Sequence, residues 1–259
     1  MKISVVLSCY NGEKYIVEQL DSLKEQSRMP DEVLIIDDCS KDNTASIVKK
    51  YIENNNLNNW IVIINEQNKG WRENFIAGMK MAKGDIIFPC DQDDIWNKNK
   101  LEKMAGVMEK DPNILTLVAN YVPFYEGEEY RKVSDLFTKN MKFDDKIQKI
   151  SMNNKALYIY RPGCVMATRR NLIEIADQYR FKEYPHDALL WRTALVLDGL
   201  YLYNYEAIKF RRHASNASDK ARHKKQDKIE DSQYYIRVSE ALKKMIVENG
   251  NEKSKIQQL

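Results

Sequence analysis

The sequence predicts an α/β protein with a mainly parallel sheet flanked by helices. Short runs rich in β-branched residues alternate with helical patterns through the first 90 residues. Such alternation with short connections is typical of a parallel sheet that is covered on both faces. Polar residues follow each of the four apolar runs directly. Because ligands bind outside the carboxyl ends of parallel strands, these four positions together predict one ligand site.

The elements of this first part follow in regular order. Continuous apolar runs indicate strands buried on both faces, and they occupy residues 3–8, 33–36, 60–64 and 85–89. Apolar residues at helical spacing predict the helices between these strands, at residues 13–26, 44–54 and 73–82. Lys83-Gly84 is a C-cap signal that ends the third helix.

The pattern is less regular after residue 120. Residues 120–142 are aromatic and charged, and we interpret them as an insertion or lid. The remaining predicted elements are a turn into a strand, two helices and a strand, at residues 161–167, 169–178, 186–197 and 200–210. From residue 218 the chain is first very basic and then helical, with a loose apolar stripe.

Composition excludes several classes of protein. The 259 residues are 43% hydrophobic and 31% charged, which is typical of a folded globular protein. The net charge of +3 arises from 41 basic and 38 acidic residues, so charge gives no argument for a nucleic-acid partner. No apolar run reaches the roughly 20 residues of a spanning helix, and the four cysteines lack C-x-x-C spacing. We expect a cytoplasmic protein, either free or at the inner face of the membrane.

Two acidic groups end predicted strands. Asp91 and Asp93, two residues apart, can converge on one hard cation. The alternative is a solvated turn, but three aspartates within four residues repel one another without a counter-cation. Asp37-Asp38 follows another strand, where a carboxylate can accept hydrogen bonds from a base or a ribose. That pair is also compatible with a helix N-cap or with a receiver-type signalling domain.

Four segments carry a resemblance to a known family. Ser-Val-Val-Leu-Ser-Cys-Tyr-Asn-Gly (4–12), Glu-Val-Leu-Ile-Ile-Asp-Asp-Cys-Ser (32–40), Asn-Lys-Gly-Trp-Arg-Glu-Asn (68–74) and Asp-Gln-Asp-Asp-Ile-Trp (91–96) resemble the successive signatures of the inverting family 2 glycosyltransferases with the GT-A fold. The resemblance covers residues 1–215. Segment 91–96, His186-Asp187 and Arg211-Arg212-His213-x-x-Asn216 are most similar to the bacterial rhamnosyltransferase branch.

The resemblance implies a domain division and a set of binding residues. It implies a GT-A domain at 1–215, with a nucleotide-binding half at 1–118 and an acceptor half at 119–215, and a helical extension at 216–259. Asp38 matches the aspartate that reads the pyrimidine, and Cys39 stands where glycine is common. The other nucleotide-sugar residues implied are Ser8, Tyr10, Asn11, Asn68, Gly70, Arg72, Asn74, Asp91 and Arg212.

The resemblance also implies the reactive groups. Asp91 and Asp93 match the D-x-D pair that holds Mg²⁺ or Mn²⁺, and His213 matches a further metal ligand or phosphate contact. Asp187 matches the catalytic base. From the residues alone, inverting transfer needs one general base near the acceptor hydroxyl, and a carboxylate suits that role. Asp187 as a helix N-terminal charge and His213 as a surface histidine are the alternatives.

The resulting hypothesis is a metal-dependent inverting glycosyltransferase of the hexosyltransferase class. It would move a rhamnose-, galactose- or glucose-type sugar from a dTDP- or UDP-linked donor to a glycan, glycopeptide or lipid-linked acceptor during bacterial polysaccharide or glycoconjugate assembly. The alternatives are a sugar-nucleotide nucleotidyltransferase, which would carry a glycine-rich loop after the first strand, and a non-catalytic nucleotide-sugar-binding module. The basic C-terminal helix suggests either peripheral membrane contact or a homo-oligomer.

Overall fold

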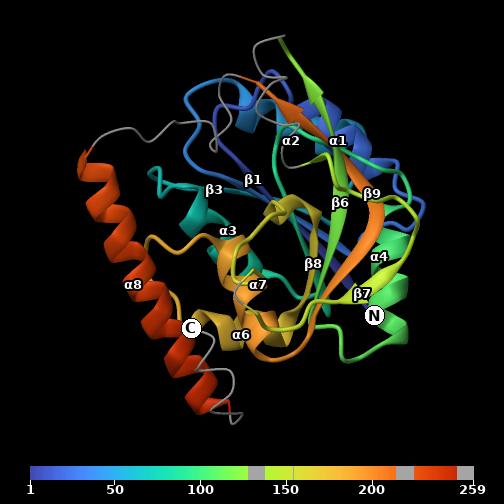
Figure 1. Ribbon diagram of the computed structural model, residues 1–259. Helices are drawn as coiled ribbons and strands as arrows, with labels where there is room; N and C mark the ends of the chain where they lie inside the picture. Colours follow the sequence, from blue (N-terminus) through green and yellow to red (C-terminus); the bar gives the residue numbers. More distant parts are fainter. Residues whose placement is uncertain (128–137, 154, 214–224, 250–259) are drawn as a thin grey trace.

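The computed structural model contains a nine-stranded sheet between two layers of helices (Figure 1). It describes residues 1–127, 138–153, 155–213 and 225–249, with the side chains of 225–231 left out. The strand order is β3-β2-β1-β4-β8-β6-β9-β5, and β7 pairs with β9. The predicted α/β class is therefore confirmed.

The first half of the sheet is parallel and holds the central strands. β1 (Ile3–Cys9) lies between β2 (Glu32–Asp37) and β4 (Ile86–Cys90), and β3 (Trp60–Ile64) pairs with β2. β1 is buried along its whole length. A strand covered on both faces has no solvated face to make polar, so its sequence reads as a continuous apolar run.

The second half of the sheet is mixed. β8 (Met166–Arg169) runs antiparallel to both β4 and β6 (Thr116–Tyr125). β6 is parallel to the long strand β9 (Leu200–Arg212), which also pairs antiparallel with β5 (Ile95–Trp96) and β7 (Ile147–Lys149). β9 therefore extends from its pairing with β7 to its pairing with β5, beside the loop that follows β4.

The side chains of β1 point alternately into two cores, and a separate layer of helices covers each core. Ile3, Val5 and Leu7 face one core with α1 (Ile16–Lys24), α2 (Thr44–Asn54) and α4 (Lys100–Lys110). Val6 faces the other core with α3 (Trp71–Met81) and α6 (Arg170–Asp177). Successive strand side chains point to opposite faces, so one strand anchors both cores. α7 (His186–Val196) contributes residues to each core.

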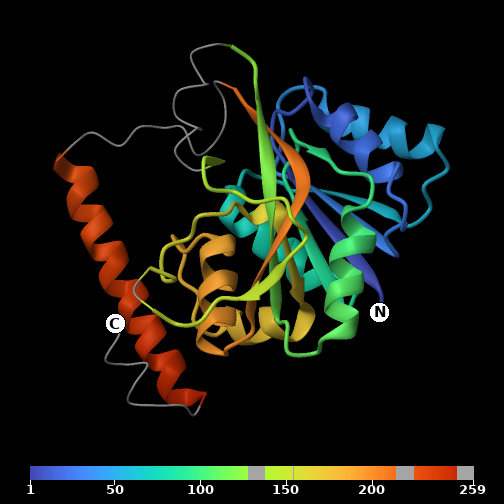
Figure 2. The same ribbon diagram turned by 45° about the vertical axis from the view of Figure 1, so that its right-hand side comes forward.

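The C-terminal helix α8 (Lys225–Glu248) lies along the outside of the molecule, beside α6 and α7 and away from α4 (Figure 2). Val238, Leu242, Met245 and Ile246 are its buried residues, and they complete the core under α7. The basic residues Lys220, Arg222, His223 and Lys224 and the expected boundary at 215/216 lie outside the described residues. Membrane contact and self-association of this helix stay predictions.

The expected elements of residues 3–90 are found with ends shifted by a few residues. Asn120 to Tyr125, however, continue β6 beside β9, so the expected insertion or lid does not begin at residue 120. These residues are half-buried beyond Tyr121, because the strand extends past the covering helices, and their mixed aromatic and polar composition follows from that. The 118/119 boundary falls within this strand, and the division into donor and acceptor halves stays a functional prediction. Among the described residues, every helix is too short or too polar to cross a bilayer.

Two glycines in helices give a matched test of the packing. A Cβ on Gly78 of α3 would lie 2.6 Å from Val6 Cγ1 and 3.1 Å from Ile36 Cγ1, whereas a Cβ on Gly106 of α4 would meet nothing within 4 Å. We expect Gly78→Ala to lower the free energy of unfolding by roughly 1–3 kcal/mol through overpacking. Gly106→Ala should raise it by roughly 0.5–1 kcal/mol through helix propensity. Urea unfolding monitored by circular dichroism measures both, and equal effects would contradict the packing of α3 on the sheet.

Candidate active site

Polar side chains at the ends of the parallel strands are hydrogen-bonded to one another. Asn74, near the start of α3, is fully buried and links three strand ends. Its Nδ2 donates to Ser8 Oγ at 2.7 Å and to the carbonyl oxygen of Ile36 at 2.9 Å, and its Oδ1 accepts from Asn65 Nδ2 at 2.8 Å. The predicted convergence of these strand ends is therefore present, and Asn74 is its centre.

The buried carboxylate of Asp38 shapes the loop between β3 and α3. Its Oδ1 accepts hydrogen bonds from Asn65 Nδ2 and from the Lys69 N–H, and its Oδ2 accepts from the Gly70 N–H, all at 2.8 Å. Asn68 Nδ2 donates to the Asp38 carbonyl oxygen at 3.1 Å. Gly70 has φ 85°, a conformation that favours glycine. Recognition of the nucleotide base by Asp38 stays a prediction. The hydrogen bonds show that this carboxylate also holds the loop between β3 and α3.

The loop after β1 is hydrogen-bonded to the loop after β4 and to the loop after β2. The Tyr10 N–H donates to Gln92 Oε1 at 2.8 Å, and Gln92 Nε2 donates back to the Tyr10 carbonyl oxygen at 3.2 Å. The Asn11 N–H donates to Ser40 Oγ at 2.9 Å, and Asn11 Oδ1 accepts from the Lys41 N–H at 2.8 Å. The side chain of Tyr10 is left exposed at this edge. Gln92, the residue between the two paired aspartates, is thus a positioning residue that sequence reasoning missed.

The Asp37 carboxylate accepts hydrogen bonds within the turn that follows β2. Its Oδ1 accepts from the Ser40 N–H at 2.9 Å and its Oδ2 from the Ser40 hydroxyl at 2.5 Å. Cys39, inside this turn, has φ 62°. That conformation explains why glycine suits the position, and the two bonds from Ser40 hold the cysteine in it.

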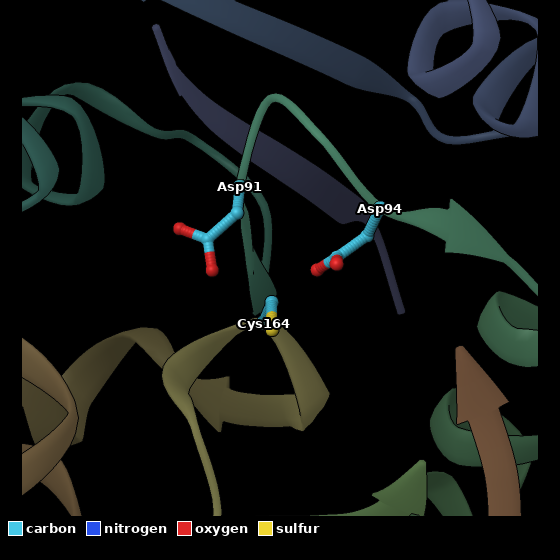
Figure 3. Close-up of side chains that lie close together, drawn as sticks. All are labelled: Asp91, Asp94 and Cys164. Carbon is cyan, nitrogen blue, oxygen red and sulfur yellow. The ribbon is translucent and has the colours of Figure 1, made fainter. Parts of the chain in front are cut away.

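The loop after β4 brings two carboxylates together with a thiol. Asp91 and Asp94 point toward Cys164, and one ligand atom of each lies within 4.8 Å of the others (Figure 3). Asp94 Oδ1 accepts the Arg211 N–H at 3.0 Å, while its buried Oδ2 has no hydrogen-bond partner among the described residues. Burial and then the charge of Asp93 raise the pKa of Asp91 to about 7, and the same two causes raise the pKa of Asp94 well above its ordinary value. The effect of burial and mutual repulsion on these carboxylates therefore exceeds the opposing effects of Lys100 and of the Arg211 N–H.

Asp93 and His213 meet although 120 residues separate them. His213 Nε2 lies 2.8 Å from Asp93 Oδ2, and the imidazole is buried. Its ring packs against Tyr15 of the loop before α1, with 4.6 Å between ring centroids. Strand β9 makes this contact possible, because it ends beside residues 91–94, the loop after β4 that we call the acidic loop. Two of the three residues expected to hold a metal are thus in direct contact.

The donor atoms of the acidic loop and of β9 fit a hard divalent cation. Asp91, Asp93 and His213 would hold Mg²⁺ or Mn²⁺ through carboxylate oxygens and one imidazole nitrogen. Burial raises the pKa of the Cys164 thiol well above its ordinary value, so the thiol stays protonated and is a poor ligand for a soft cation. The unpartnered Asp94 Oδ2 and the raised pKa of Asp91 are the observations that favour a cation here.

Lys100 is fully buried beneath the acidic loop. Its Nζ donates to the Cys164 carbonyl oxygen at 2.6 Å and lies 3.0 Å from the Trp96 ring centroid. Burial lowers the pKa of Lys100 to about 7. This lysine is the first residue of α4, and its hydrogen-bond partner Cys164 is 64 positions away in the sequence. For that reason no local pattern indicated it.

Arg211 holds the acidic loop to α1 and β6. It is buried, and its Nε donates to the Asp93 carbonyl oxygen at 2.8 Å. Its Nη1 donates to Glu126 Oε1 at 3.0 Å, and its Nη2 pairs with Glu18. The guanidinium also lies over the ring of Tyr15, 4.8 Å from the centroid. Arg211 therefore organises the residues around His213, a role that its position beside Arg212 did not reveal.

Asp187 lies in the first turn of α7, half-buried. Its Oδ1 accepts the Ala188 N–H at 2.7 Å, and its charge contributes to the raised pKa of Asp91. The neighbouring His186 is buried, stacks on Phe75 at 4.1 Å and has both ring nitrogens unpartnered among the described residues. Burial lowers the pKa of His186, so its imidazole is neutral. A Cβ on Gly163 would lie 2.3 Å from His186 Nε2, so the Gly163 backbone packs directly against the His186 ring.

Two further arginines were expected near the nucleotide diphosphate. The Arg72 guanidinium lies 4.4 Å from the Trp71 ring centroid, and its buried Nε has no partner among the described residues. The Arg212 guanidinium lies 5.4 Å from the Phe210 ring centroid. Both stand at the edge of the sheet that carries the acidic loop, and their phosphate contacts stay predictions.

Residues 4–175 match the profile described as "Glycosyl transferase family 2". The chain belongs to glycosyltransferase family 2. An uncharacterized glycosyltransferase of Nostoc is 26% identical over 203 residues, which cover 78% of this chain and 59% of that protein. Poly(ribitol-phosphate) beta-N-acetylglucosaminyltransferase TarS of Staphylococcus aureus is 36% identical over 120 residues, 46% of this chain and 21% of TarS. The chain thus spans less than two thirds of the length of these relatives.

Solved structures show the same fold. S. aureus TarS 1-349 in complex with UDP is 26% identical, with a TM-score of 0.66, over 82% of this chain and 61% of that one. The complex of TarS 1-349 with UDP-GlcNAc has a TM-score of 0.71 at 24% identity, over 93% of this chain and 65% of that one. GalNAc-T7 with UDP, GalNAc and Mn²⁺ has a TM-score of 0.64 at 14% identity, over 83% and 44%. The family 2 chain therefore has the GT-A fold.

The ion pairs of Glu126 predict an acid-dependent stability. The Lys14 ammonium, with Tyr15 and Arg211, lowers the pKa of Glu126 to about 2, from 4.5 in the absence of these partners. A lowered pKa contributes stability that is complete above about pH 4.5 and is lost as pH falls toward 2. We expect Glu126→Gln to unfold at lower urea concentration at pH 7, with the difference from wild type shrinking between pH 5 and 2. Glu53→Gln, at an exposed position on α2, is the control. A difference that is constant across this pH range would contradict the assignment.

Proposed function

We propose that this chain transfers a sugar from a nucleotide diphosphate to an acceptor hydroxyl with inversion at the anomeric carbon. The observation that carries the proposal is the joining of two groups at one edge of the sheet. One is the acidic loop with His213, and the other is Asp187 at the start of α7, close enough for its charge to act on Asp91. Membership of family 2 supports glycosyl transfer rather than nucleotidyl transfer or simple binding.

We propose a UDP-linked donor as the first choice. TarS structures contain UDP or UDP-GlcNAc, and these share the fold of this chain. Ser8, Tyr10, Asn11, Asp38 and the loop that Asp38 organises would contact the base and ribose, and Arg72 and Arg212 would balance the diphosphate charge. A dTDP-linked rhamnose donor, expected from segment 91–96, is the second candidate. Screening both classes of sugar nucleotide for hydrolysis separates them.

We propose that Mg²⁺ or Mn²⁺ binds at Asp91, Asp93 and His213. The crowding of three carboxylates within residues 91–94 supports this, because burial and the charge of Asp93 raise the pKa of Asp91 to about 7, and Mn²⁺ is present in the GalNAc-T7 structure of the same fold. A divalent cation at this place would supply positive charge for the leaving diphosphate. Asp93 and His213 would then be held by the bonds of Arg211 to the acidic loop and by the Tyr15 ring.

We propose that Asp187 removes the proton of the acceptor hydroxyl. A base for inverting transfer must face the anomeric carbon from the side opposite the leaving group. α7 carries Asp187 on a different element from those that carry the donor residues, which supports that arrangement.

Loss of the Asp93 carboxylate tests the metal assignment. We expect Asp93→Asn to abolish the rise in melting temperature that Mn²⁺ gives in the presence of UDP, because one ligand and one charge are removed. Sugar-nucleotide turnover should fall roughly 100-fold or more. Asp198→Asn makes the same change at an exposed residue at the opposite end of β9 and should retain the wild-type response. A full metal response in Asp93→Asn would contradict the assignment.

Asp187→Asn tests the base. We expect UDP affinity, measured by calorimetry, to stay within about twofold of wild type, because Asp187 is not among the donor residues. Transfer should fall roughly 10²–10⁴-fold, which is the usual contribution of a positioned general base. Asp198→Asn again controls for the loss of one carboxylate. Retention of most of the transfer rate would show that another group takes the proton.

A further inference from the structure

Arg161 is a buried cation that has only neutral hydrogen-bond partners. It is 8% exposed and lies two residues before the short helix η2 (Gly163–Val165). Its Nε donates to Asn120 Oδ1 at 2.8 Å, and its Nη1 donates to the Tyr160 carbonyl oxygen at 2.8 Å. Within the described part of the chain, Nη2 makes no hydrogen bond, and it is not among the atoms sealed from solvent. The guanidinium is therefore anchored on one side and available on the other.

Among the described residues, two other arginines are buried, and only one of them has a counter-charge. Arg211 binds the carboxylates of Glu18 and Glu126. Arg192 donates through Nε to the Leu157 carbonyl oxygen and through Nη1 to the Tyr184 and Tyr234 hydroxyls, so it too has only neutral partners, but it lies between α7 and α8 rather than beside the acidic loop. Burying a guanidinium costs hydration energy that a counter-charge normally offsets. Burial lowers the pKa of Arg161, and the groups that act against this are tyrosines rather than carboxylates.

The surroundings of Arg161 add further polar groups without adding negative charge. Tyr121 on β6 lies close enough to Arg161 and Arg212 for both charges to lower the pKa of its hydroxyl, against the larger effect of burial, which raises it. Tyr125 also acts on that hydroxyl, and its own buried Oη has no hydrogen-bond partner among the described residues. A guanidinium fork beside phenol hydroxyls is a donor-rich site, and such sites suit phosphate or carboxylate oxygens.

The segment that carries Arg161 lies on the side of the proposed base. Gly163 contacts His186, the neighbour of Asp187, and Cys164 adjoins Asp91 and Asp94. The proposed donor residues, in contrast, follow β1, β2 and β3. Building on the proposed function, we propose that Arg161, Tyr121 and Tyr125 form a binding site for a phosphate group of the acceptor. The acceptor is then an anionic, phosphate-bearing molecule whose hydroxyl is delivered toward Asp187.

The donor diphosphate is the other source of phosphate oxygens, so the test separates the two. Inorganic phosphate is titrated calorimetrically into protein saturated with UDP and Mg²⁺, which occupies the donor site. We expect wild type to bind one phosphate, and Arg161→Gln to bind it roughly tenfold or more weakly, because a charge-assisted hydrogen bond is lost. Arg170→Gln removes the same charge from an exposed position on α6 and should bind phosphate as wild type does. UDP affinity should be unchanged in both variants.

Two results would overturn the proposal. Equal phosphate affinity in wild type and Arg161→Gln would show that Arg161 does not bind the anion. Weaker UDP binding by Arg161→Gln, with no phosphate binding by UDP-loaded wild type, would assign Arg161 to the donor. Tyr125→Phe removes only the unpartnered hydroxyl and should weaken phosphate binding, which keeps the test decisive if Arg161→Gln unfolds. If wild type failed to bind UDP or to turn over any sugar nucleotide, the proposed function would fail instead, and the same phosphate titration of wild type and Arg161→Gln without UDP would still test the anion site.

Discussion

The arrangement of the residues around the site depends on the negative charge of the three carboxylates that follow β4. Asp91, Asp93 and Asp94 lie within four residues, and burial weakens the screening that water would give their repulsion. Three positively charged or polar groups approach the loop, one from the start of α4 and two from the end of β9. Lys100 lies beneath it, the Arg211 backbone and side chain bind its far end, and His213 contacts Asp93. The loop is therefore held in place by the end of β9 and the start of α4.

The elements of residues 3–90 could be predicted from the sequence because each gives its own local signal. A strand buried on both faces, such as β1, reads as an unbroken apolar run, and short polar turns separate the runs. The second half gave weaker signals. β6 is buried in its first half and half-exposed in its second, so its pattern changes at the bulges around Asn120. Its pairing with β9 joins residues about 85 positions apart, and local periodicity carries no information on such contacts.

The candidate site shows the same division. Ser8, Asn11, Asp38 and the acidic loop could be located because strand ends of a parallel sheet converge by geometry alone. The residues that hold them could not. Asn74 looked like a member of the nucleotide loop, yet it is the buried link among three strand ends. Arg211 was one of two adjacent arginines, and only the fold distinguishes the buried one from Arg212. Its partner Glu18 is 193 residues away, which no motif expresses.

The two sides of the site are connected by one segment, and that connection bears on how the reaction is organised. Residues 161–164 contact the acidic loop through Cys164, the start of α7 through Gly163 and the Asn120 amide through Arg161. Gly163 has no room for a Cβ against His186, so this segment and the start of α7 cannot shift independently. Lys100 fixes the same segment from below through the Cys164 carbonyl oxygen. The acidic loop and the start of α7, which carries Asp187, are therefore joined through this one segment. For the proposed inverting transfer, in which leaving group and base must stay in line, this connection restricts the distance between the acidic loop and Asp187.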